Sequence, residues 1–220
     1  MNKEISRTQR VLNVWAITLI IWSVYRAQLH MPEWFDELIA KPLVFLVPMY
    51  LFITHIDQKK FLEDIWFQTT NIWTNVKIAL LIGLVFAVSA FIANAIRTGT
   101  FSISSILLPF NNSSFYFALV LVLATGFTEE ALSRGFVLKQ LFQESGQLYS
   151  SVFLSSIFFL ILHIPILLSN YSFTGQQLLI FFGTDFLLSL VNSFVFLNRR
   201  SLIPVILIHA FYNLAILMYI

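Results

Sequence analysis

Ionisable and amide side chains lie inside long apolar stretches of this 220-residue sequence. An ionisable side chain in the centre of a membrane helix costs about 3 kcal/mol on insertion scales, so it usually faces a partner or a water-filled cavity and marks a functional site. The first three apolar stretches carry ionisable residues only at or near their ends, so we expect the chemistry of this protein to reside in the second half. The candidate residues are Glu129, Glu130, Arg134, His163, Asp185, His209 and Asn213.

The segment EEALSR, residues 129–134, contains two adjacent carboxylates and one arginine. Glu130 and Arg134 are four residues apart with the acid first, the favoured order for an ion pair on a helix. Glu129 lies about 100° further round the helix and points elsewhere. The spacing therefore predicts that Arg134 holds Glu130, while Glu129 is free to act as a base in an apolar site. Two acids at a wet helix end, both bridged to Arg134, are the alternative interpretation.

Two later segments carry the other polar groups. Phe159 lies one helical turn before His163, and His209 and Asn213 share a face of the last apolar stretch. Separately, each also fits a structural residue that hydrogen-bonds between helices. Together with Glu129 they supply a base, an imidazole and hydrogen-bond donors, which can activate water and stabilise a tetrahedral oxyanion. The set favours peptide hydrolysis within the membrane.

The composition indicates that membrane helices position these residues. Hydrophobic residues make up 58% and charged residues 11% of the chain, against about 45–50% and about 25% in soluble domains. A span needs about 20 mostly apolar residues. We therefore predict an all-α, polytopic transmembrane bundle of about seven spans. They lie near residues 10–27, 42–56, 77–97, 115–138, 149–169, 177–198 and 201–220.

The distribution of lysine and arginine predicts the orientation, because these residues concentrate on the cytoplasmic side. A cytoplasmic N-terminus leaves only Arg26, Lys41 and Arg97 outside. The other ten of the 13 basic residues are then cytoplasmic: Lys3, Arg7, Arg10, Lys59, Lys60, Lys77, Arg134, Lys139, Arg199 and Arg200. We expect an N-terminus in the cytoplasm and, after seven spans, a C-terminus outside.

The connections between the spans suggest a single membrane domain over residues 1–220. Residues 57–76 alternate charged and apolar side chains at roughly helical spacing and include tryptophans, which indicates a helix in the membrane interface or an ordinary amphipathic connector. Residues 98–114 are rich in Ser, Asn and Gly and are expected to form an exposed loop. Within the domain, residues 1–114 are expected to be accessory spans and residues 115–220 a catalytic core.

The three motifs resemble those of a known family, the CAAX-processing and bacteriocin-processing (CPBP, or Abi) intramembrane endopeptidases. Its motifs Glu-Glu-x-x-x-Arg, Phe-x-x-x-His and His-x-x-x-Asn match residues 129–134, 159–163 and 209–213, in that order. The resemblance covers about residues 115–220. The first three spans resemble no family that we identify.

The resemblance implies a glutamate-dependent protease. Glu129 would be the base, His163 would orient or activate the water, and His209 and Asn213 would line the oxyanion site. The remaining motif residues would support the site, with the Glu130–Arg134 pair holding the motif helix. That supporting group is Glu130, Arg134 and Phe159. Asp185 is outside the pattern, and it either pairs with a histidine or contacts a neighbouring helix.

Members of this family are often labelled metalloproteases, so a metal is the alternative to a metal-free site. Glu129, His163 and His209 would then be the three ligands of an open catalytic zinc site, and Asn213 would support it from outside. The absence of cysteine excludes thiolate ligands and disulfides. We favour a site without a cofactor and keep zinc as the alternative.

Other functions remain as alternatives. The chain lacks His-Glu-x-x-His and Gly-x-Ser-x-Gly, which argues against zinc site-2-type and rhomboid-like proteases. A non-proteolytic family member that acts as a membrane regulator, scaffold or bacteriocin self-immunity protein remains open, and a proton-coupled transporter is disfavoured by the lack of paired repeats. The expected partners are membrane lipids and a peptide or protein substrate that enters from the cytoplasm. No nucleic acid is expected, and the expected location is a bacterial plasma membrane.

Overall fold

The computed structural model describes residues 5–99, 113–169 and 175–219, and these residues form helices and connections without a strand. This confirms the predicted all-α architecture, whereas most of the predicted 98–114 loop lies outside the described residues. The helices are α1 (Arg7–Gln28), α2 (Glu33–Phe35), η1 (Asp36–Ala40), α3 (Lys41–Leu51), η2 (Phe52–Ile56), α4 (Phe61–Asp64), α5 (Ile72–Thr98), α7 (Ser113–Glu130), η4 (Ala131–Leu138), α8 (Lys139–Ser145), α9 (Leu148–Ser169), α10 (Gly175–Arg199) and α11 (Leu202–Tyr219).

Within the described residues, five helical segments are long and apolar enough to cross a membrane. They are Glu33–Ile56, Ile72–Ala93, Phe115–Ser145, Leu148–Leu167 and Leu178–Arg199. The first predicted span coincides with α1, which is not among the five, and the last contains a shorter apolar helix, Leu202–Ile216. With α1 and α11, the chain provides the expected set of about seven helices.

Two of the spans are longer than predicted because π-helical turns extend them. The predicted span at 42–56 begins at Glu33, with η1 before α3 and η2 after it. The predicted span at 115–138 continues to Ser145 through η4 and α8. Single π-turns within α-helices often occur at functional sites, and η4 begins directly after Glu130.

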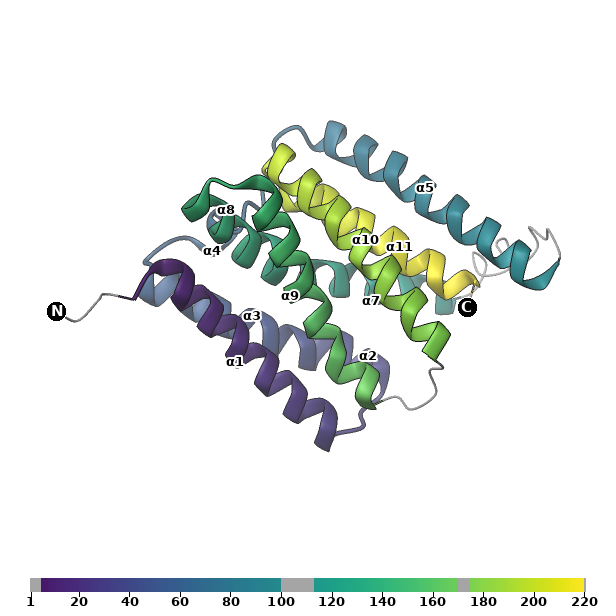
Figure 1. The fold of residues 1–220 in the computed structure, drawn as a ribbon, viewed down its shortest axis with the longest axis horizontal. Helices are drawn as coiled ribbons and strands as arrows, with labels where there is room; N and C mark the ends of the chain where they lie inside the picture. The colour runs from purple at the N-terminus through teal and green to yellow at the C-terminus, as the bar shows by residue number, and fades with distance from the viewer. Residues whose placement is uncertain (1–4, 100–112, 170–174, 220) are drawn as a thin grey trace.

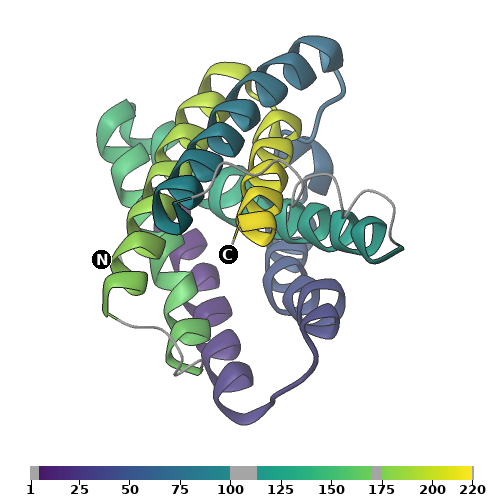
Figure 2. The same ribbon diagram turned by 90° about the vertical axis from the view of Figure 1, so that its right-hand side faces the viewer.

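The long helices form a bundle whose two edges are visible in Figure 1. α1 and α3 lie at one edge, α5 lies along α11 at the opposite edge, and α9 and α10 lie between them. Figure 2 shows α7 running across α11 rather than along it. This crossing brings the end of α7, with Glu129 and Glu130, into the middle of the bundle.

The connector at 57–76 differs from its prediction as an interface helix. Before α5 begins at Ile72, its helical part is the single turn α4, and the positive φ angles of Trp66 and Asn71 interrupt any continuation between the two helices. Asp57 and Asp64 pair with Arg7 at 2.6 and 3.4 Å, and Asp64 also pairs with Lys139 at 3.0 Å. Of the two alternatives that the sequence left open, the structure therefore favours a connector over a continuous interface helix, because these charges bind other parts of the chain.

Asp64 is the centre of this ion cluster. Burial acts to raise the pKa of its carboxyl, but the charges of Lys139, Lys59 and Arg7 outweigh burial and hold the pKa below its ordinary value. Arg7 also donates to Gln140 of α8. The cluster joins the start of α1, the turn α4 and the start of α8 at one end of the bundle.

Candidate active site

The sequence-predicted polar residues converge in the middle of the bundle. Glu129 and Glu130 come from the end of α7, Arg134 from η4, His163 from α9, Asp185 from α10 and His209 from α11. Of these side chains, His163 retains the most exposure, at 16%, and the others are almost fully buried. This buried cluster of acids, histidines and arginine is the candidate active site.

Gly126 allows α7 and α11 to approach closely next to the cluster. A Cβ atom at Gly126 would lie 3.0 Å from the carbonyl oxygen of Ile206 and 3.6 Å from Cβ of His209. A larger side chain would therefore push the two helices apart. The glycine, one turn before Glu129 and Glu130, lets His209 reach both carboxylates.

Glu130 is the most densely bonded group in the cluster. Its Oε1 accepts hydrogen bonds from Arg134 Nη1 at 3.1 Å and from Asn192 Nδ2 at 3.0 Å, and it lies 2.8 Å from His209 Nδ1. The Arg134 guanidinium lies over the Phe159 ring, 4.4 Å from its centroid. The Glu130–Arg134 pair expected from the spacing is thus present, and it holds α7, η4, α9, α10 and α11 together.

Glu129 is not free, contrary to the expectation from sequence. Lys41 at the start of α3 places its Nζ 2.8 Å from Glu129 Oε1, and the same ammonium lies 2.6 Å from both carboxylate oxygens of Glu37. Thr125 of α7 also donates to Glu37. The distribution of basic residues predicted Lys41 on the outer side of the membrane, but its side chain is buried in the bundle. A segment of the accessory half therefore supplies the counter-charge of Glu129.

The two histidines face the other oxygen of Glu129. His163 Nε2 lies 3.5 Å and His209 Nε2 lies 3.7 Å from Glu129 Oε2. His163 Nδ1 donates to the Phe159 carbonyl at 2.9 Å, since a carbonyl oxygen only accepts. The far nitrogen of each ring is thereby engaged, and each Nε2 is directed towards Glu129.

Asp185 meets both of the alternatives that the sequence left open. Its Oδ2 lies 3.8 Å from His163 Nε2, and its Oδ1 accepts a hydrogen bond from the Tyr212 hydroxyl at 2.8 Å. The Tyr212 oxygen also lies 2.8 Å from the hydroxyl of Thr184 on α10. Asp185 therefore joins α10 to α11 and adds a second carboxylate near the same Nε2 atom of His163 that faces Glu129.

A small cavity borders Glu129 and His163. Glu129 Oε2 is buried and makes no hydrogen bond to the described residues. The cavity has a volume of about 20 Å³, and a single water molecule needs about 10–15 Å³ measured in this way. The cavity is lined by Trp22, Lys41, Phe45, Glu129, Phe159, Leu162, His163 and Ile166. Apart from Lys41, Glu129 and His163, these residues are apolar or aromatic. The cavity has room for one water beside the carboxylate.

Asn213 stands apart from the other predicted residues. It is half-buried on α11, one turn after His209, and its amide forms no hydrogen bond with the described part of the chain. The structure thus brings Glu129, His163 and His209 together directly, whereas Asn213 shares only their helix face.

The residues present do not suit a divalent cation. No set of three histidine or acidic side chains in the described ranges is arranged to hold a metal ion. In addition, the Lys41 ammonium already occupies Oε1 of Glu129, and a second positive charge on the same carboxylate would be repelled.

Sequence reasoning missed Lys41, Glu37 and Asn192. Glu37 and Lys41 are four residues apart with the acid first, which is the same signal that identified Glu130 and Arg134. That signal was overlooked because the pair lies just before the predicted second span. Asn192 gave no signal, because an isolated amide in an apolar helix resembles an ordinary contact between helices.

Comparison with known protein families gives a match for the C-terminal part of the chain, which carries most of the site residues. Residues 111–215 match the family model described as Rce1-like, type II CAAX prenyl endopeptidase. Neither the curated proteins nor the solved structures gave a match. The matched segment contains all three motifs that suggested the resemblance and excludes Lys41. Over these residues the match agrees with the resemblance to the CAAX-processing endopeptidases that the three motifs suggested.

Proposed function

We propose that this protein is an intramembrane endopeptidase that hydrolyses a peptide bond with a water activated by Glu129. The observation that supports it most is the cavity of about 20 Å³ beside Glu129 and His163, two residues of the segment that matches an endopeptidase family model. One water there would lie between a carboxylate base and an imidazole, as hydrolysis requires. The substrate class that the family suggests is a prenylated C-terminal CAAX peptide.

The proposed reaction proceeds in two steps. Glu129 Oε2 accepts a proton from the water, and the resulting hydroxide attacks the scissile carbonyl carbon to form a tetrahedral oxyanion. His209 and Asn213 stabilise the oxyanion, and His163 orients the water. The carbon–nitrogen bond then breaks, and the proton held by Glu129 passes to the leaving amine. Water is thus divided between the two products, and no other reactant is needed.

Asn213 distinguishes this mechanism from the zinc alternative. We expect Asn213→Ala to lower kcat about 10²- to 10³-fold with KM nearly unchanged, because one oxyanion donor is lost. The measurement is cleavage of a prenylated CAAX peptide by purified protein in lipid vesicles. The wild-type enzyme should retain its activity after prolonged chelation. Stoichiometric zinc, with chelation that abolishes activity and zinc that restores it, would instead make Glu129, His163 and His209 ligands.

Lys41 is proposed as a positioning residue for Glu129. Its ammonium fixes Oε1, so Oε2 is turned towards the cavity and the histidines. We expect Lys41→Met to lower kcat at least tenfold, because two neighbouring carboxylates lose their shared counter-ion. Lys41→Arg should restore part of the loss. The matched control is Lys60→Met, which breaks an exposed lysine–glutamate pair of 2.8 Å. Equal activities of Lys41→Met and Lys60→Met would contradict this role.

The orientation and location are part of the same proposal. A cytoplasmic N-terminus places the Arg7–Asp64 cluster on the cytoplasmic side of a bacterial plasma membrane, and substrate would approach from that side. The alternative is a non-proteolytic regulator, scaffold or bacteriocin self-immunity protein. Cleavage of a reconstituted peptide by the wild type and its loss in Glu129→Gln would favour the enzyme, and an intact peptide with both would favour the alternative.

A further inference from the structure

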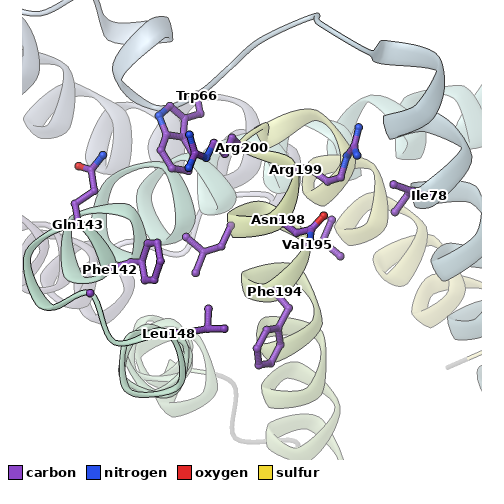
Figure 3. A pocket seen from close by; sticks show the side chains of 12 residues that line it. Trp66, Ile78, Phe142, Gln143, Leu148, Phe194, Val195, Asn198, Arg199 and Arg200 are labelled. Atoms are coloured by element: carbon purple, nitrogen blue, oxygen red, sulfur yellow. The ribbon is translucent and has the colours of Figure 1, made fainter.

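A second cavity lies at the end of the bundle that carries the Arg7–Asp64 cluster. Its volume is about 790 Å³, within the range of about 300–1,000 Å³ typical of ligand sites. Figure 3 shows it between the α8–α9 turn, the last turns of α10 and the start of α5. It shares no lining residue with the cavity beside Glu129, so it is separate from the candidate active site.

The lining combines apolar walls with positive charge. The apolar and aromatic walls come from Trp66, Ile78, Phe142, Leu148, Phe194, Val195 and Leu197. Arg199, Arg200, Asn198 and Gln143 supply hydrogen-bond donors, and no acidic residue lines the cavity. Such a lining suits a molecule with an anionic head and an apolar body.

Both arginines keep donors for a ligand. Arg199 uses Nε for Asn75 at 3.0 Å, and the Arg200 guanidinium lies 6.0 Å from the centroid of Trp66. Within residues 5–99, 113–169 and 175–219, neither arginine forms an ion pair with an acidic side chain. The positive charge of the cavity is therefore not neutralised by these parts of the chain.

An exposed apolar surface continues from the cavity along α9 and α10. Phe194 lines the cavity and is 41% exposed, and its ring lies 6.3 Å from that of Tyr149 on α9. Further along, Phe153 of α9 and Phe186 of α10 are 6.1 Å apart, and Leu187 is exposed. Both α9 and α10 contain candidate spans, so we infer that this surface faces the hydrocarbon of the membrane.

We propose that this cavity binds an anionic phospholipid. Arg199 and Arg200 would hold the phosphate, because guanidinium groups bind phosphate oxygens in paired hydrogen bonds, and the acyl chains would lie on the α9–α10 surface. A net anionic headgroup is favoured over a zwitterionic one, because the lining offers no carboxylate to a choline ammonium. Phosphatidylglycerol should therefore bind more tightly than phosphatidylcholine.

The test measures lipid retained by the purified full-length protein in native mass spectrometry. We expect one molecule of phosphatidylglycerol per chain, with phosphatidylcholine, glycerol phosphate and inorganic phosphate retained less. Arg200→Asn should weaken the phosphatidylglycerol complex about fivefold, the value of one cationic side chain near an anionic headgroup. Asparagine tolerates the positive φ of this position, 49°. Lys60→Asn, which removes an exposed lysine at the same end, is the matched control and should change little.

A second variant tests the cavity itself. Asn198 is exposed on α10 at the rim, so Asn198→Trp should fold and fill the space, and the bound lipid should be lost. Equal retention of the two phospholipids would overturn the proposal, as would equal effects of Arg200→Asn and Lys60→Asn, or retention unchanged by Asn198→Trp. Tighter binding of inorganic phosphate than of phospholipid would identify a site for a free anion and overturn it too.

Discussion

We expect Glu129→Gln to abolish cleavage while the protein still accumulates in the membrane at the wild-type level. Glutamine keeps the shape of the side chain but cannot accept the proton of the water. Folding is expected to survive, because Lys41 keeps Glu37 as its ionic partner at 2.6 Å, so no buried ammonium is left without a counter-charge. Loss of activity without loss of protein is therefore the expected signature of a base.

The measurement compares initial rates of peptide cleavage with the amount of folded protein in the same vesicles. Glu63→Gln is the control, because Glu63 is a largely exposed acid that pairs with Lys60 at the surface. We expect the control to cleave at the wild-type rate. Cleavage by Glu129→Gln at a near wild-type rate would disprove the assignment of Glu129 as the base.

For the neighbouring Glu130, we expect a substitution to lower the amount of folded protein as well as the activity. We expect Glu130→Gln to lower the free energy of unfolding by about 3–5 kcal/mol, because it leaves the buried Arg134 without its ionic partner. In the described ranges, Arg134 pairs with Glu130 and with no other acid within 4.0 Å. The folded fraction should fall together with the activity, and thermal unfolding in detergent measures the loss.

A double variant separates the buried charge from the remaining bonds of Glu130. In Glu130→Gln/Arg134→Met the unpaired guanidinium is removed, while an amide oxygen can still accept from Asn192 and His209. The double variant should therefore be more stable than Glu130→Gln alone, by the argument that an unpaired buried charge costs more than an absent pair. Equal or lower stability of the double variant would contradict this explanation.

The sequence predicted contacts between residues that are close along the chain and missed contacts between residues that are far apart along it. The Glu130–Arg134 pair is local, so helical spacing was sufficient to identify it. The environment of Glu129 depends on Lys41, which is 88 residues away, and no local spacing could place that ammonium. The position of Glu129 on its helix face alone predicted an unpaired carboxylate. In the folded chain, tertiary packing brings Lys41 to it.

The interface helix considered for residues 57–76 is absent for the same physical reason. Its charges and aromatic residues follow a helical period, but Asp57 and Asp64 gain more from Arg7 and Lys139 than from a solvated helix face. Trp66 stacks on Phe196 of α10, with ring centroids 5.1 Å apart. Periodicity predicts a helix only where no distant partner binds the same side chains.

The size of the cavity beside Glu129 has a consequence for the catalytic cycle. Each hydrolysed peptide bond consumes one water, and a volume of about 20 Å³ stores no second one. Trp22, Phe45, Leu162 and Ile166 line the cavity, and this volume leaves no space for a polypeptide. In the proposed mechanism, the helices that carry these residues separate to admit a peptide, and the same separation admits the next water. Substrate loading and solvent resupply are thus one event per turnover, and the interval between openings sets an upper limit on the rate.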